Sequence, residues 1–176
     1  MASVTQALYT WSKNRDLHAT SALDVLKHQR ELTYITQLYR LHYWHIELEA
    51  PSLDVANQSI NQLVNQTYYL VNTNNSHYQI GNPPDFLTML PKPYYTAIVS
   101  QKKPNTYDAL RTTILNRFGF SISVLNQHIL WGLKTSVDVS SDDIHSDIFN
   151  TQSVQSGLLV NPIYETYELT AHDINN

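Results

Sequence analysis

The chain has 176 residues, 42% of them hydrophobic and 15% charged, so it can form one domain or two small ones with a real core. Its formal net charge of −4 argues against nucleic-acid binding by bulk phosphate attraction and against a basic membrane-surface module. Cysteine is absent, which excludes disulfides, thiolate metal sites and cysteine nucleophiles. Because the sequence shows neither a membrane-spanning apolar run nor a signal-peptide pattern, we expect a soluble, cytoplasmic protein that binds no membrane.

The first half of the sequence predicts, in chain order, a strand, a helix, two strands, a helix and a strand. Strand patterns cover residues 7–12, 32–38, 42–50 and 77–80. One helical pattern covers residues 22–29 with Ser21 as its N-cap, and a second follows a cap at Ser52 or Asp54. The polar residues 72–76 predict a turn before the last strand.

The second half of the sequence repeats this order. Strand patterns cover residues 94–100, 120–124, 129–139 and 164–170. A helix is expected to open near Thr106 and to end at Gly119, and Ser140 or Ser141 caps another. We therefore predict an α+β fold of two tandem β-α-β-β-α-β units, the ferredoxin-like order, with antiparallel sheets that form a pseudo-dimer.

A proline-rich segment, residues 82–93, separates the two halves. Its four prolines are incompatible with a helix interior or a central strand, so it is predicted to be a linker between units 1–81 and 94–176. Four of its residues are apolar, which indicates that the linker packs against the protein. These four residues are Phe86, Leu87, Met89 and Leu90.

An internal repeat supports this division of the chain. Residues 70–80 and 159–169 match at an offset of 89, and nine of the forty positions from 41 to 80 are identical at that offset. The same offset, applied without a gap, places Ile46, Leu48 and Ala50 opposite Thr135, Val137 and Val139, so we expect the apolar phase to be kept. Near the start of each half an offset of 87 fits better, which a difference of two residues in a loop would explain.

The segment 157–169 resembles the end of the PurS family, the small subunit of phosphoribosylformylglycinamidine synthase in purine biosynthesis. That family ends a helix with Leu-Leu-x-Asn-Pro and enters a strand holding Glu and Tyr, as residues 158–167 do here. Phe118-Gly119-Phe120 is also similar to the family. The family's Asp-Pro-x-Gly loop and Arg-x-Gly-Lys segment are absent, and the first half reads Asn72-Thr73 where the second half reads Asn161-Pro162.

The resemblance implies a non-catalytic subunit that bridges the synthetase and glutaminase subunits and supports ammonia transfer. Family members are single-unit chains that pair, so two fused units would imitate one pair. We expect no catalytic residue, metal or cofactor, and we leave open a homo-oligomer. The candidate partner-binding residues are Lys102, Lys103, Asn161, Pro162, Tyr164, Glu165 and Tyr167.

Other readings of the sequence remain open. One is a regulatory or small-molecule-binding double domain of the ferredoxin-like or ACT type, with a ligand between the halves. The loop Lys102-Lys103, ahead of a helix N-terminus, could hold a phosphate. The segment His18-Ala19-Thr20 resembles one half of a two-histidine phosphodiesterase signature but lacks its second copy, and His42 and His45 would point oppositely on a strand.

Overall fold

The computed structural model describes residues 2–149 and 158–172, and within them the predicted α+β class is confirmed. Six strands form one sheet in the order β3-β1-β2-β5-β4-β6. The pairs β1–β2, β1–β3, β4–β5 and β4–β6 are antiparallel. The strands are β1 (Ala2–Ser12), β2 (Ile35–Ala50), β3 (Ser76–Ile80), β4 (Tyr94–Gln101), β5 (Ile122–Thr135) and β6 (Glu165–His172).

Capping residues mark several of the helix ends. They are α1 (Leu17–Asp24), continued by the π-helical turn η1 (Val25–Gln29), α2 (Leu53–Gln66), α3 (Asp85–Thr88), α4 (Asp108–Phe118) and α5 (Ser141–Ile148). Of the two candidates predicted for each cap, Ser52 caps α2 and Ser140 caps α5 by accepting backbone N–H bonds, and Gly119 ends α4 with φ of 76° as predicted. The first helix begins earlier than predicted, because Asp16 rather than Ser21 caps it.

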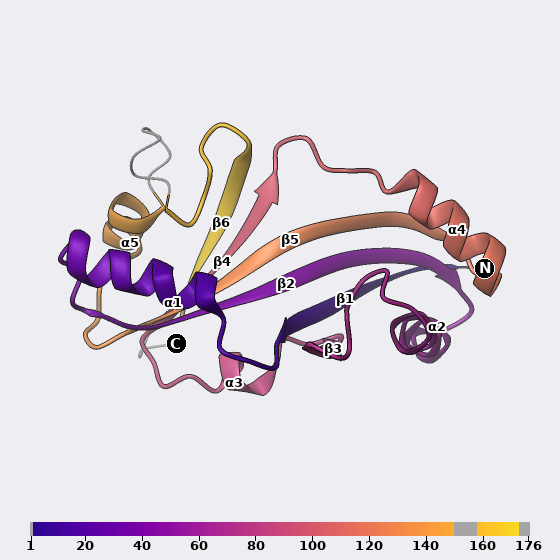
Figure 1. Ribbon diagram of the computed structural model, residues 1–176, viewed down its shortest axis with the longest axis horizontal. Coiled ribbons are helices and arrows are strands. Elements are labelled where there is room, and N and C mark those ends of the chain that lie inside the picture. Colours follow the sequence, from indigo (N-terminus) through magenta and orange to yellow (C-terminus); the bar gives the residue numbers. More distant parts are fainter. Residues whose placement is uncertain (1, 150–157, 173–176) are drawn as a thin grey trace. The chain divides into compact units, whose positions relative to one another are not determined.

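In the middle of each half, one long strand replaces the pair of strands that was predicted there. The strand β2 covers residues 35–38 of the first predicted segment and all of 42–50, and β5 covers most of 120–124 and 129–139 (Figure 1). The prediction of a break was wrong because residues 39–41 and 125–128 contain neither Gly nor Pro, so nothing interrupts the backbone hydrogen bonds. Each half therefore has the element order β-α-β-α-β.

The chain forms two compact units, and each draws on both halves of the sequence. Unit 1 comprises Met1–Asn14, His42–Pro84 and Pro104–His128, and unit 2 comprises Arg15–Leu41, Asp85–Lys103 and Ile129–Asn176. The helix α1 of the first half belongs to unit 2, and α4 of the second half belongs to unit 1. The ranges 1–81 and 94–176 describe the repeat in the sequence, whereas the two units describe how the chain packs.

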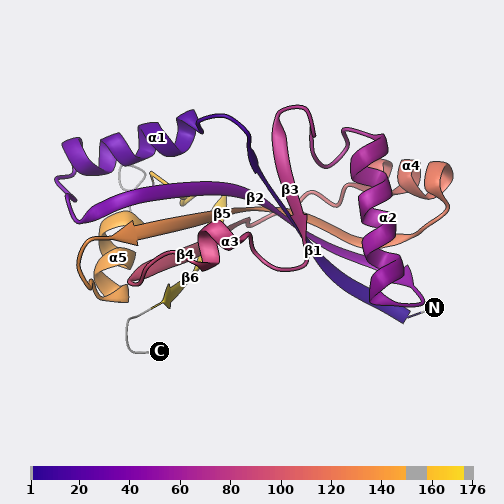
Figure 2. The same ribbon diagram turned by 90° about the horizontal axis from the view of Figure 1, so that it is seen from below.

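The strands β2 and β5, the two long strands in Figure 2, each have residues in both units. Residues 35–41 of β2 belong to unit 2 and residues 42–50 to unit 1, while β5 divides between residues 128 and 129. These divisions fall where the sequence suggested a break in each strand. The sequence pattern therefore marked, within each of these two strands, the point at which the strand passes from one unit to the other.

Each unit has its own hydrophobic core. In unit 1, α2 and the single helix from the other half, α4, pack on strand residues such as Leu8, Trp44 and Ile46. In unit 2, α1 and α5 pack on strand residues such as Tyr95 and Leu133. Because α1 and α4 lie in the core of the unit that is not built by their own half, neither half has a complete core alone.

The proline-rich segment packs against unit 2 through part of its apolar set. Leu87 and Leu90 are buried, whereas Phe86 is 38% and Met89 75% exposed. A Cβ atom at Gly132 of β5 would lie 2.3 Å from the Cδ1 of Leu87, so only glycine leaves room for this contact. No helix within residues 2–149 and 158–172 is long and apolar enough to cross a membrane.

The strand registers repeat between the two units. Ser12 pairs with Ser76, and Gln101 pairs with Glu165, an offset of 89 for both partners. The pairing of Ala7 with His45 corresponds to that of Thr96 with Gly132, which sets an offset of 87 between β2 and β5.

The gap-free pairing of apolar residues in these strands was therefore wrong. At the observed offset Ile46 corresponds to Leu133 and Leu48 to Thr135, while Val137 is 55% exposed. The sequence indicated the two-residue difference only near the start of each half, but it extends through the long strands.

Candidate partner-binding surface

A tight turn joins the core of unit 2 to β6. The side-chain Oδ1 of Asn161 accepts a hydrogen bond from the backbone N–H of Ile163 at 3.1 Å. The backbone oxygen of Asn161 accepts from the N–H groups of Tyr164 (3.1 Å) and Glu165 (2.8 Å). Asn favours such turns because its side chain can accept a hydrogen bond from the backbone two residues further on. The ring of Pro162 fixes its own φ at the value that the second residue of the turn requires.

The Glu165 carboxylate closes this turn. Its Oε2 accepts a hydrogen bond from the backbone N–H of Asn161 at 2.7 Å, and its Oε1 accepts one from the Nε2 of Gln101 at 2.9 Å. Charge-assisted hydrogen bonds of this kind are stronger than neutral ones. Glu165 therefore fixes the shape of the turn and holds it against β4.

Lys102 joins the turn to the end of β4 by two hydrogen bonds. Its Nζ donates to the backbone oxygen of Pro162 at 2.6 Å, and its backbone N–H donates to the oxygen of Tyr164 at 2.8 Å. The ammonium group of Lys102 is thus used within unit 2.

Unit 1 contains the same turn at an offset of 89. The Nζ of Lys13 donates to the oxygen of Thr73 at 2.6 Å, and its backbone N–H donates to the oxygen of Asn75 at 2.9 Å. Asn72 Oδ1 accepts from the N–H of Asn74 at 3.1 Å, as Asn161 does in unit 2. At the offset of 89, the hydrogen bonds of the turn therefore repeat as well as its sequence.

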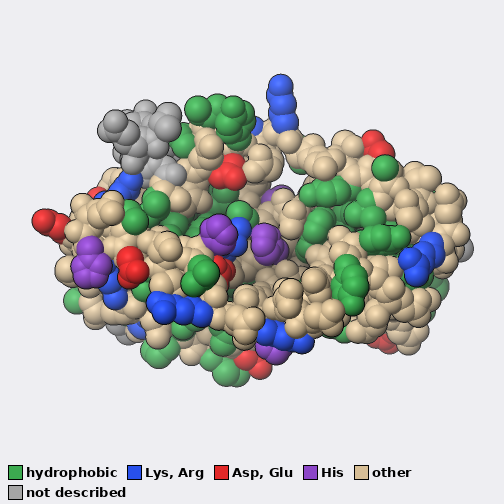
Figure 3. Space-filling model, viewed as in Figure 1, with side chains coloured by type: hydrophobic (Ala, Val, Ile, Leu, Met, Phe, Trp, Pro, Cys, Tyr) green, Lys and Arg blue, Asp and Glu red, His purple; other side chains and the backbone are tan. Residues whose placement is uncertain are grey.

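The two turns differ in the side chains that they expose. In unit 2, Ile163 is 56% and Tyr164 63% exposed, whereas their counterparts in unit 1 are Asn74 and Asn75. Figure 3 shows hydrophobic side chains gathered over the turn before β6, with a basic side chain projecting from the loop that follows β4. Lys103, in that loop, is exposed. We name Lys103, Pro162, Ile163 and Tyr164 the turn surface.

Tyr167 has a different environment from the other predicted residues. Its ring stacks on Phe149 with centroids 4.9 Å apart, and its hydroxyl is hydrogen-bonded to the His145 ring. Burial raises the pKa of the Tyr167 hydroxyl above its ordinary value. Tyr167 therefore anchors α5 on β6.

The predicted partner-binding residues thus lie together in unit 2 but differ in what they do. Lys103, Pro162 and Tyr164 present side chains on the turn surface, while Lys102, Asn161 and Glu165 build the turn. Ile163, which is exposed beside them, was not among the predicted residues, although an apolar residue between Pro162 and Tyr164 was a visible signal.

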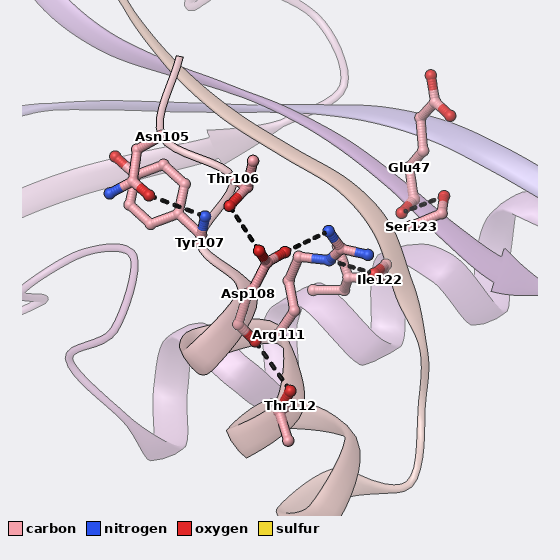
Figure 4. Close-up of polar contacts among 9 residues, drawn as sticks. All are labelled: Glu47, Asn105, Thr106, Tyr107, Asp108, Arg111, Thr112, Ile122 and Ser123. Carbon is pink, nitrogen blue, oxygen red and sulfur yellow. Dashed lines mark hydrogen bonds and ion pairs between the residues drawn. The ribbon is translucent and has the colours of Figure 1, made fainter. Parts of the chain in front are cut away.

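The N-terminus of α4, which was considered above as a phosphate-binding site, carries the carboxylate of Asp108 (Figure 4). Asp108 accepts a hydrogen bond from Thr106 Oγ1 at 2.7 Å and pairs with Arg111 Nη1 at 3.2 Å. Asn105 Oδ1 accepts from the N–H of Tyr107. A negative charge at this N-terminus opposes the binding of a second anion there.

The histidines do not assemble a metal site within the described ranges. His45 Nε2 lies 3.3 Å from Glu47 Oε1 on the same strand. No group of three or more metal-binding side chains occurs among residues 2–149 and 158–172.

Comparisons with protein-family models, with curated proteins and with solved structures find no match to this chain.

Proposed function

We propose that the chain is a duplicated PurS-like protein that bridges the synthetase and glutaminase subunits of a phosphoribosylformylglycinamidine synthase complex without catalysing a reaction itself. The observation that carries this proposal is the turn surface of unit 2. It combines exposed apolar side chains with a backbone held by Lys102, Asn161 and Glu165, at the segment in which the sequence resembles the family.

The arrangement of the units supports a fused pair of family members. On a ferredoxin-like reading, each unit has four strand segments and two long helices, unit 2 also holds the short helix α3, and unit 1 has the strand order β3-β1-β2-β5. One helix and one strand segment in each unit come from the other half of the chain. Exchange of identical elements is a common route to dimers, and here both partners would be in one polypeptide.

The rigidity of the turn also suits a bridging role. A preorganised surface loses less conformational entropy on binding than a loop that must first be ordered. Tyrosine and isoleucine at such a surface supply apolar contact area, and tyrosine is enriched at protein interfaces. The exposed ammonium of Lys103 would add attraction for an acidic patch on a partner.

The experiment is reconstitution from purified proteins. The chain is mixed with the synthetase and glutaminase subunits of the same source, and the masses of the complexes are measured by size-exclusion chromatography with light scattering. We expect a ternary species, and we expect glutamine-dependent synthesis to require the chain. The proposal fails if the two large subunits associate and work without the chain and neither binds it.

The second candidate, a small-molecule-binding double domain, is favoured by one specific observation, a groove in unit 2 that is described next.

A further inference from the structure

A groove of about 640 Å³ lies in unit 2 between α1 and β5, a volume in the range of small-molecule sites. The apolar residues that line it include Ala22, Ile129 and Trp131. The polar residues that line it are His18, Ser21 and Arg40. No hydrogen bond or ion pair joins the Arg40 side chain to another residue in the part of the chain that the structure describes.

The internal repeat identifies the corresponding place in unit 1. At the offset of 87, Trp131 corresponds to Trp44, and Gln127 to Arg40. At an offset of 88, every buried or half-buried residue from Tyr107 to Phe118 has a buried or half-buried counterpart in the first helix, although the first helix has three further half-buried residues whose counterparts are exposed. In chain order, Ala19, Ala22 and Leu26 correspond to Tyr107, Leu110 and Ile114.

In unit 1 the Tyr107 side chain reaches this place. Its ring meets Trp44 edge to face, with centroids 5.4 Å apart, and its hydroxyl donates a hydrogen bond to Gln127 Oε1 at 3.3 Å. Its backbone adopts φ of 54°, an unusual value for a tyrosine, just before α4 (Figure 4). In unit 2 the counterpart of Tyr107 is Ala19, so no ring is supplied by that position.

Two kinds of replacement therefore distinguish the site in unit 2: smaller side chains on the helix, and a positive charge on the strand. Alanines replace Tyr107 and Leu110, which makes room for a planar group beside Trp131. Arginine replaces Gln127, and because a guanidinium only donates hydrogen bonds, the matching group must be an acceptor. A carboxylate is the acceptor that arginine binds with the best geometry.

We propose that the groove of unit 2 binds a small aromatic carboxylate, with its ring against Trp131 and its carboxylate on Arg40. The bound ring takes the place that Tyr107 takes in unit 1. This proposal does not depend on the bridging function, because the site lies within the chain and can be tested without partner subunits.

The test is titration of the purified full chain by calorimetry with phenylacetate and 4-hydroxyphenylacetate. We expect saturable binding with one site per chain. Acetate, which lacks the ring, and 4-cresol, which lacks the carboxylate, are expected to give no saturation over the same range. Absence of saturable binding by both aromatic carboxylates would overturn the proposal.

Two variants copy unit 1 into unit 2. Arg40→Gln is expected to weaken binding at least tenfold, and Ala22→Leu, which adds the bulk of Leu110, to abolish it. Arg117→Gln, on α4 of unit 1, is the matched control and should bind as the unchanged chain does. Thermal unfolding of each variant checks the fold; if Ala22→Leu does not fold, Arg40→Gln still decides. Unchanged affinity in a folded Arg40→Gln variant would contradict the site.

Discussion

Trp44 and Trp131 occupy equivalent positions on β2 and β5, 87 residues apart. They are 4% and 5% exposed, and neither indole N–H has a hydrogen-bond partner among the described residues. A buried donor without a partner costs free energy, so the same feature at two matched positions is an unusual coincidence unless the two halves share an origin. The pair supports duplication independently of the match between residues 70–80 and 159–169.

The two lysine contacts should contribute equally to stability. Lys13→Ala and Lys102→Ala each remove a hydrogen bond to a turn carbonyl, and because both lysines are exposed we expect a loss of about 0.5–1 kcal/mol in each case. The free energy of unfolding is measured by urea titration. A substantial loss in one variant and none in the other would contradict the equivalence of the two turns.

Gly132→Ala should destabilise unit 2. The new Cβ would lie 2.3 Å from the Cδ1 of buried Leu87, and overpacking of this kind typically costs about 1–3 kcal/mol. Leu87→Ala alone should also destabilise, through a cavity. The double variant should be more stable than the sum of the two losses predicts, because the clash is then removed. If the loss of stability of the double variant in urea titrations equals the sum of the two single losses, contact with Leu87 is not the cause of the destabilisation by Gly132→Ala.

Leu159→Asp should unfold unit 2, including elements from the first half of the chain. Leu159 is 5% exposed in the same core as Leu26 and Ile35, and an unpaired charge there is strongly destabilising. Hydrogen exchange should show lost protection in α1 as well as in β4, with protection retained in α2.

Pro162→Ala is the control for that variant, since the hydrogen bonds made by Asn161 do not need the proline ring, and it should cost little. If Leu159→Asp deprotects only residues 94–172 and leaves α1 protected, the assignment of α1 to unit 2 is wrong.

The unfolding free energy should fall in alkaline solution. Desolvation, together with the neighbouring Tyr43, raises the pKa of Tyr9 from 10 to about 12. Since the folded state favours the neutral hydroxyl, this stabilisation is complete below pH 10 and is lost as the pH rises from 10 to about 12. Tyr9→Phe should reduce the alkaline loss between unfolding measurements at pH 9 and pH 11. An identical loss in the variant would remove Tyr9 as a cause.

Local signals predicted much of the fold. The caps Ser52 and Ser140, the end of α4 at Gly119 and the turn at residues 72–76 each follow from the chemistry of a few neighbouring residues. The start of α1 was missed because Asp16 caps it through the N–H groups of His18 and Ala19, a signal that was visible but unused.

The exchange of α1 and α4 between the units was beyond a local reading. The inward-facing residues of α1, Ala19 and Ala22, show which face of the helix is buried but not which half of the chain covers it. The turn surface was partly predictable, because Asn161, Pro162 and Tyr164 are consecutive or nearly so. The contact of Lys102 with Pro162 depends on the pairing of β4 with β6, which only the fold supplies.

The central claim, that the turn surface carries partner binding, is tested most directly by copying the turn of unit 1 into unit 2. The double variant Ile163→Asn, Tyr164→Asn restores the residues found at 74 and 75, so the turn should keep its shape while losing its apolar side chains. The matched control is Asn74→Ser, Asn75→Ser on the turn of unit 1. We measure the affinity of each chain for the synthetase and glutaminase subunits by calorimetry. The account predicts that the first variant folds but binds at least one subunit tenfold or more weakly, while the control binds normally. Equal binding by both variants, or no binding by the unchanged chain, would contradict it.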